Sequence, residues 1–574
     1  MRTIKNLLLI IAIALYSFQS YTQPLPLPNN PAQELILQQQ RERELREQMD
    51  STSNVRIPEL EQVQPARLAI PEETPCFPID NIVLVGELAD KFQFALSATD
   101  DGPDGQDSAT GRCLGTAGIS IVMGRIQNAI ITKGYVTTRI LAAEQDLTTG
   151  TLALTVIPGQ IRAIRWGEGS QIRTSWRTAL PMREGDILNL RDIEQALEVF
   201  KRVPTADANI EIEPTETPGQ SDLVLYWQQK FPFRLNLSID DGGSRSTGRY
   251  QGAVTLSYDN WLTLNDLFYV SLNHHLADSM GGNSRGYSLH YSVPIYSNWL
   301  ISLNGSYYKY EQQIAGINQN YAYSGSSQNA DITLSRLIYR NSSIRLNGYT
   351  RGWTRKSHNY IDDVQIEVQR RQTAGWELGA DYRQFIGNAI LNTTLSYKRG
   401  TGANRSLRAP EENYGEGTSR MKIVNLNASL SIPWRIGNQN FRYYGTIRGQ
   451  WNDTPLIPQD QFSIGGRYTV RGFDGKNTLM GDRGLLWRND IGWVIPNTSH
   501  ELYAGIDFGR VSGPATKYQV GQNLTGAVIG LRGGFNIKNQ GYFSYDAFVG
   551  TPLHKPGGFE TSKFTSGFNL NFSF

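Results

Sequence analysis

The sequence predicts a transmembrane β-barrel of about 16 antiparallel strands, preceded by two small α+β units and an N-terminal helix. Three observations predict it: a strictly alternating C-terminal segment, the repetition of that alternation over 231–574, and an export signal at the N-terminus. In the last eleven residues, one face carries Phe564, Phe568, Phe572 and the terminal Phe574, and the other is small and polar. Such a strand suits lipid on one side and a wet lumen on the other.

Composition excludes several classes of protein. The chain has 574 residues, 39% of them hydrophobic, with 56 Gly, 28 Tyr and 11 Trp. No run of about 20 apolar residues follows the N-terminus, which excludes a bundle of membrane helices. Frequent glycine and aromatic residues are typical of strands joined by tight turns. A net charge of +2 argues against a nucleic-acid partner, which would need a concentrated basic surface.

Residues 1–22 are expected to be a signal peptide. Arg2 and Lys5 precede the apolar run Leu7–Leu15, and cleavage is expected near Thr22. The alternative, a retained membrane anchor, is disfavoured because the apolar run is too short. A signal peptide followed by a barrel places the protein in the outer membrane of a Gram-negative bacterium.

The segment 31–49 is expected to form one helix, because it begins with proline and contains good helix formers without a breaker. At 1.5 Å per residue it would be roughly 28 Å long, about the height of a barrel wall. The charged run Arg41–Glu47 excludes a core helix. Two interpretations remain, a solvated tail and a helix inside a polar lumen. Residues 50–75 contain prolines without periodicity and are interpreted as a linker.

Two α+β units of similar order are expected at 76–159 and 160–230. Their expected helices are 118–133 and 190–202. Their expected strands are 77–85, 135–141, 151–157, 161–166, 208–213 and 222–228.

The barrel, 231–574, alternates short and long connections, as outer-membrane barrels do between periplasmic turns and outer loops. The expected short turns are 340–343, 386–389 and 537–541, and the expected long loops are 312–328, 355–371 and 400–421. A large soluble β-sandwich is the alternative, but its strands would not need a lipid-compatible face throughout.

Cofactor and metal chemistry is not expected. Cys76 and Cys113 are the two cysteines, and in an exported chain they can pair, which would stabilise the fold by about 4 kcal/mol. The six histidines are scattered, so no metal site is expected. Hydrolase, Walker and zincin motifs are missing from the sequence, so no catalytic residue is assigned. A catalytic site in the lumen or outer loops is kept as an alternative.

One group of residues late in the barrel is a candidate for a specific arginine–carboxylate contact. A loop of about thirty residues between strands ending near Asn452 and beginning near Gly484 has a glycine-rich tip whose arginine could bind a carboxylate bidentately. The strand after next offers a lumen-facing aspartate between two glycines, which leave room for a packed loop. These candidates are Val470, Arg471, Gly472 and Phe473 at the tip, and Gly505, Asp507 and Gly509 in the strand. The alternative is a surface arginine and an aspartate that meets lumen water.

The order and combination of these motifs resemble the TpsB transporters of two-partner secretion, in the haemolysin-secretion and contact-dependent-inhibition branch (ShlB/FhaC/CdiB-like). The resemblance rests on the VRGF tip, the strand motif at 505–509, CFPIDNIVLVG at 76–86 and GYVTTR at 134–139. It implies two POTRA domains, a plug helix at 31–49 and a lumenal salt bridge between Arg471 and Asp507. The family's paired cysteines correspond to Cys76 and Cys113.

The resemblance also implies a function. A secreted TpsA exoprotein (haemolysin, adhesin or contact-dependent inhibition toxin) would bind the POTRA domains by its N-terminal secretion domain and cross the barrel unfolded. Edge strands at 135–141 and 222–228 are the candidate receivers of an extended segment. Outer-membrane lipid and the barrel assembly machinery are the other expected partners, with Phe574 as the assembly signal. The alternatives are an outer-membrane assembly and insertion factor, and a diffusion pore or gated receptor.

Overall fold

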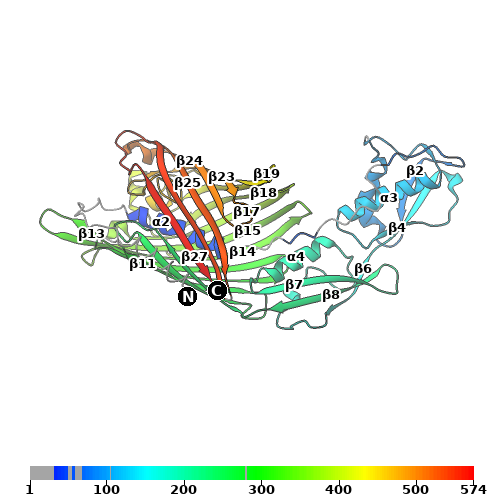
Figure 1. The fold of residues 1–574 in the computed structure, drawn as a ribbon, viewed down its shortest axis with the longest axis horizontal. Helices are drawn as coiled ribbons and strands as arrows, with labels where there is room; N and C mark the ends of the chain where they lie inside the picture. Colours follow the sequence, from blue (N-terminus) through cyan, green and yellow to red (C-terminus); the bar gives the residue numbers. More distant parts are fainter. Residues whose placement is uncertain (1–30, 50–54, 58–67, 104, 278–280, 539) are drawn as a thin grey trace.

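The computed structural model describes residues 31–49, 55–57, 68–103, 105–277, 281–538 and 540–574. It contains a closed barrel with a helix inside it and two small domains at one end, the second lying next to the barrel and the first farther away (Figure 1). The expected signal peptide lies outside the described residues, as do 50–54 and 58–67 of the expected linker. None of the described helices is both long and apolar enough to cross a bilayer.

Helix α2 (Pro31–Met49) lies within the barrel (Figure 1). Leu35 is 3% exposed and packs in a cluster with Tyr308, one of three tyrosines from the barrel wall. Ile36, the next residue of the helix, is buried with Ala32 and Met480. The helix therefore occupies the lumen, and the solvated-tail interpretation is wrong for this segment.

The first small domain is a helix packed on a three-stranded sheet of order β2-β5-β4, with a separate β1–β3 pair. The single strand expected at 77–85 is split at Asp80, because β1 pairs with β3 whereas β2 pairs with β5. Cys76 and Cys113 form a disulfide beside β1 and β3. The elements are β1 (Phe77–Ile79), β2 (Asn81–Val85), η1 (Ala89–Asp100), β3 (Arg112–Leu114), α3 (Thr116–Thr132), β4 (Arg139–Ala142), η2 (Leu147–Thr149) and β5 (Thr151–Ile157).

The second small domain repeats this plan with the sheet order β6-β8-β7. Its core includes Leu197 and Phe200 of α4 and Trp227 of β8. Strand β8 pairs with β6 on one side and β7 on the other, so the expectation of an open edge at 222–228 is wrong. The sequence could not reveal this strand order, because central and edge strands of a small sheet show the same alternating pattern. The elements are β6 (Gln160–Trp166), η3 (Trp176–Thr178), α4 (Leu190–Lys201), β7 (Ala206–Pro214) and β8 (Gln220–Gln229).

Sixteen long antiparallel strands close the barrel in the described part of the chain, and β9 pairs with both β10 and β27. The two-residue strand β16 (Val364–Gln365) adds a short hairpin to β15. The sixteen are β9 (Phe233–Asp240), β10 (Tyr250–Asp259), β11 (Leu267–Ala277), β12 (Asn283–Tyr296), β13 (Trp299–Ala315), β14 (Asn320–Arg340), β15 (Ile344–Ile361), β17 (Arg371–Ile386), β18 (Ala389–Thr401), β19 (Lys422–Ile436), β20 (Gln439–Asn452), β23 (Arg483–Val494), β24 (Glu501–Ser512), β25 (Asn523–Ile537), β26 (Gly541–His554) and β27 (Thr565–Ser573).

The connections follow the expected alternation with two exceptions. The three short turns lie where the sequence predicted them, and 402–421 forms a long loop with one 3-10 segment, η5 (Pro410–Tyr414). The loop expected at 312–328 is wrong, because β13 and β14 continue as a paired hairpin to Ala315 and Asn320. The loop expected at 355–371 is likewise wrong in its first part, because β15 extends to Ile361 and pairs with β16, before η4 (Glu367–Gln369). Backbone pairing does not need the apolar face, so these hairpins continue beyond the point where hydrophobic alternation ends.

Candidate functional site

The connection between β20 and β23, residues 453–482, folds into the barrel and is called the lumenal loop here. It contains η6 (Pro458–Asp460), β21 (Phe462–Ile464) and β22 (Leu479–Gly481). On one side Gln459 donates to Ser357 Oγ of β15 at 3.0 Å, and Asp460 lies 3.3 Å from Arg355 and 3.5 Å from Lys398. Its glycine-rich tip reaches β24 to β26 on the other side, so the loop crosses the lumen.

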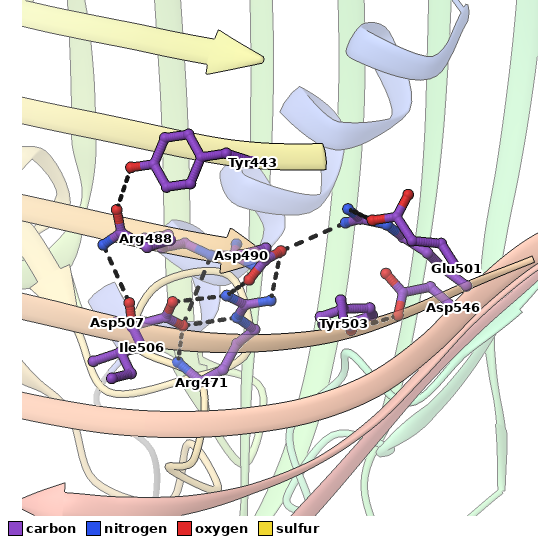
Figure 2. A network of polar contacts seen from close by, with 11 residues as sticks. Tyr443, Arg471, Arg488, Asp490, Glu501, Tyr503, Ile506, Asp507 and Asp546 are labelled. Carbon is purple, nitrogen blue, oxygen red and sulfur yellow. Dashed lines mark hydrogen bonds and ion pairs between the residues drawn. The ribbon is translucent and has the colours of Figure 1, made fainter. Parts of the chain in front are cut away.

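Arg471 at the tip is held by two carboxylates from the wall (Figure 2). Its Nε and Nη2 donate to the two oxygens of Asp507 at 2.7 Å each, and its backbone N–H donates to the same carboxylate at 2.9 Å. Its Nη2 and Nη1 also donate to Asp490, at 2.5 and 3.2 Å. The Arg471 side chain is 4% exposed and that of Asp507 is 0% exposed. The structure thus brings together the two residues that the sequence singled out.

Asp490 was missed by the sequence reasoning. It lies on β23 opposite Gly505 in register, and alternation along β23 turns it inward with Leu486 and Arg488. Two more wall arginines complete the network: Arg532 Nη1 lies 3.5 Å from Asp490, and Arg488 Nε lies 3.8 Å from Asp507. An inward acid opposite a glycine of the candidate strand was a signal that could have identified Asp490. Buried charges that are paired in this way avoid the cost of isolated desolvation.

Two wall glycines make the close approach of the loop possible. A Cβ at Gly505 would lie 2.3 Å from an Asp490 oxygen, and a Cβ at Gly509 would lie 2.7 Å from Val470 Cγ2. At the tip, Gly472 has φ +97°, and a Cβ there would lie 2.5 Å from the carbonyl oxygen of Thr551. The glycines of both motifs therefore serve packing between the loop and the wall.

The loop also carries an apolar cluster. Val470 is fully buried, and Phe473 packs edge-on against Phe559, with ring centroids 5.8 Å apart. The cluster consists of Ile464, Val470, Phe473, Leu479, Leu486, Val511, Leu524 and Phe559. The lumenal loop is therefore fixed by both the ion network and hydrophobic burial.

Helix α2 is held largely by polar contacts. Arg41 Nη1 donates to Gln251 at 2.9 Å, and its Nη2 lies 3.5 Å from Asp240. Thr247 donates to the buried Glu34 at 3.2 Å, and Gln33 donates to Thr478 of the lumenal loop at 2.5 Å. The helix therefore binds both the wall and the loop. Three pockets of about 320, 670 and 590 Å³ lie around it in the lumen.

The second small domain is joined to the barrel rim by hydrogen bonds. Arg202, at the end of α4, donates to Ser292 Oγ at 2.7 Å and to the Asn265 carbonyl at 3.1 Å. Gln195 donates to the Ser297 carbonyl at 2.8 Å. These contacts hold this domain against one end of the barrel (Figure 1).

Phe574 follows β27 at the barrel's closing seam. Its backbone exchanges hydrogen bonds with Leu235 of β9, at 2.8 and 3.2 Å, and its side chain is 63% exposed. The described register of the seam runs from Asn569 opposite Asp240 to Ser573 opposite Asn236.

Comparison with known proteins identifies the family. Residues 219–533 match the haemolysin secretion/activation protein ShlB/FhaC/HecB family, 160–214 match a POTRA domain, and 105–159 match a POTRA domain of ShlB type. The outer membrane transporter CdiB-2 of Burkholderia pseudomallei is 38% identical, over 98% of each chain. The hemolysin transporter protein ShlB of Serratia marcescens is 26% identical, over 78% of each chain.

A solved structure agrees with these matches. CdiB from Acinetobacter baumannii superimposes with a TM-score of 0.82 at 29% identity, covering 97% of this chain and 100% of that one. The barrel therefore lies in the outer membrane and the two small domains are POTRA domains in the periplasm. The chain belongs to the haemolysin secretion/activation family ShlB/FhaC/HecB, whose members are the outer-membrane pores of two-partner secretion.

Proposed function

We propose that this pore exports one large TpsA exoprotein, a haemolysin, an adhesin or a contact-dependent inhibition toxin, and that α2 is its plug. The observation that carries the proposal is the helix itself, which lies in the lumen and binds both the wall and the lumenal loop. Relatives named as hemolysin and CdiB transporters support this class of cargo. The chain acts as a conduit and performs no catalytic step.

Export requires the lumen to be cleared. An unfolded chain cannot share the lumen with α2 and the lumenal loop, so release of the helix is the gating step. The periplasm holds no ATP, so folding of the exoprotein outside the cell biases its movement outward. The polar contacts of α2 suit a reversible plug, because a hydrogen bond contributes only about 1 kcal/mol when it is neutral and about 1.5–3 kcal/mol when one partner is charged.

Recognition is assigned to the POTRA domains, residues 76–159 and 160–230, ahead of the barrel at 231–574. Strand β4 lies at the edge of the first sheet, where an extended segment of the exoprotein's secretion domain can add as a further strand. Strands β6 and β7 are the edges of the second sheet. Backbone pairing of this kind gives affinity with little demand on sequence.

The remaining assignments concern assembly and stability. The Arg471–Asp507 pair anchors the lumenal loop, and the Cys76–Cys113 disulfide stabilises the first POTRA domain. The terminal Phe574 is the signal for the barrel assembly machinery, and the outward faces of the strands contact outer-membrane lipid. No nucleic acid takes part.

The test is single-channel conductance in planar bilayers, comparing the mature chain with a chain that lacks 31–49. Deletion of the plug should convert a small, flickering conductance into a large and stable one. Gln48→Ala is the control on the same helix, because Gln48 is exposed and should leave the conductance unchanged. If the deletion changes nothing, the plug assignment is wrong and the assembly-factor alternative gains support.

A further inference from the structure

Three residues of the linker between plug and POTRA domains, Val55–Ile57, occupy a defined site at the barrel entrance. The Val55 carbonyl accepts a hydrogen bond from Arg340 Nη2 at 2.9 Å, and the Ile57 N–H donates to Glu194 Oε1 at 3.1 Å. Arg340 ends β14 at a periplasmic turn of the barrel, whereas Glu194 lies on α4 of the second POTRA domain. The linker backbone is therefore held between two parts of the molecule.

The groups that hold it form a buried ion cluster. Arg340 lies 3.3 Å from Glu194 and 3.0 Å from Glu198, and Arg345 lies 2.7 Å from Glu198. The side chains of Arg340, Glu194 and Glu198 are each at most 9% exposed. Hydrogen bonds from such charged groups are stronger than neutral ones. We call Arg340, Glu194 and Glu198 the linker-docking site.

The linker-docking site binds an extended peptide whose side chains point alternately to two surfaces. Val55 and Ile57 both pack against the apolar core of the second POTRA domain. The intervening Arg56 lies over the ring of Phe385, at a barrel turn, with 5.7 Å between its guanidinium carbon and the ring centroid. Side chains that point alternately to two surfaces are the pattern of an extended chain. The site binds the peptide backbone at two points and requires apolar side chains only at i and i+2. It therefore makes few demands on sequence, as do other grooves that bind extended peptides.

Docking of Val55 also limits the travel of the plug. The plug ends at Met49, six residues before Val55, and a chain of that length spans at most about 20 Å. Leu68 lies further along the chain, and its carbonyl accepts a hydrogen bond from Arg125 at 2.8 Å in the first POTRA domain. With 55–57 undocked, the tether from Met49 to Leu68 reaches about 65 Å. A plug of roughly 28 Å is therefore held near the entrance until the linker leaves its site.

We propose that the linker-docking site is a recognition site for an extended segment of the exoprotein, which replaces Val55–Ile57 and thereby frees the plug. The proposal rests on the function proposed above. An unfolded, β-rich exoprotein presents alternating apolar residues and free backbone groups, which are the features that this site binds in the linker. Displacement couples arrival of the exoprotein at the entrance to opening, because the same contacts cannot be made by both segments.

The test uses the mature chain in planar bilayers with a synthetic peptide, SNVRIPEL, that copies residues 53–60. Added on the POTRA side, the peptide should raise the open probability in a saturable way. The same peptide with Val55→Asp and Ile57→Asp should have no effect. In the Arg340→Ala chain the open probability should rise about tenfold or more without peptide, the change expected from loss of one charge-assisted hydrogen bond. The peptide should then add nothing.

Arg162→Ala is the matched control, because Arg162 is an exposed arginine of the same POTRA domain whose ion pair, with Asp222 at 2.6 Å, lies within that domain. It should respond to the peptide as the parent does. If Arg340→Ala misassembles in a heat-modifiability gel, the chain carrying Val55→Asp and Ile57→Asp in its own linker replaces it and should open in the same way. A peptide without effect on the parent overturns the proposal, even if the linker variants open. Since deletion of 31–49 tests the plug alone, its failure would instead overturn the proposed function.

Discussion

Removal of the Arg471 guanidinium should release the lumenal loop without unfolding the barrel. In Arg471→Ala, Asp507 and Asp490 lose four side-chain hydrogen bonds and remain buried. Breaking a buried pair by removing one partner costs about 3–5 kcal/mol. Arg488 and Arg532, at 3.8 and 3.5 Å, remain to neutralise the carboxylates, so the lower end of this range applies.

The assay is amide hydrogen exchange of residues 465–481 in the reconstituted protein. A loss of about 3 kcal/mol corresponds to an opening equilibrium about 100- to 200-fold larger, and exchange should accelerate by that factor. Arg471→Lys should give an intermediate acceleration, because lysine keeps the charge but lacks the planar fork of donors. Arg488→Ala, which removes a more distant contact, should have a smaller effect than either.

Unchanged exchange in Arg471→Ala would refute this reasoning. The loop would then be held by its apolar cluster alone, and the network around Arg471 would contribute no net stability. Equal acceleration in Arg471→Lys and Arg488→Ala would likewise contradict the role assigned to bidentate geometry. The β-strands of the barrel serve as the internal reference and should keep their protection in every variant.

Three further predictions concern the POTRA domains, each measured by hydrogen exchange of the full chain. Replacing Cys76 and Cys113 with serine should destabilise the first domain by about 4 kcal/mol, since the bond closes a separation of 37 residues; equal exchange in both proteins would contradict this. Burial, and then the charge of Asp186, raises the pKa of Asp192 to about 6. Protection of α4 should therefore fall as pH rises from 4 to 6, and Asp192→Asn should abolish that fall and stabilise the domain by about 1–3 kcal/mol at pH 7. Backbone hydrogen bonds from Gly118 and Ala117 lower the pKa of Glu73, so Glu73→Gln should loosen the first turn of α3 near neutral pH but not in strong acid.

Much of the architecture could be predicted from local pattern. Alternation along each strand decides which side chains face the lumen, and for this reason Asp507 was assigned correctly to the inner face. The helix at 31–49 was predicted with both of its ends, because proline begins it and no breaker interrupts it. The two glycine-flanked motifs were recognised as parts that could meet, although the sequence also allowed Arg471 to lie on the surface.

Tertiary structure decided which residues that are distant in sequence contact one another. Closure of the barrel brings Asp490 to Arg471. Alternation along β23 alone could place Asp490 on the inner face, but it could not place it opposite the lumenal loop. The order of the second POTRA sheet makes β8 a central strand, which its alternation could not distinguish from an edge strand. The docking of Val55–Ile57 depends on Arg340 and Glu194, which lie 146 residues apart in the sequence. The physical reason is common to all three: a strand's inner and outer faces follow from its own backbone geometry, whereas its neighbours follow from the closure of chain segments that are distant in sequence.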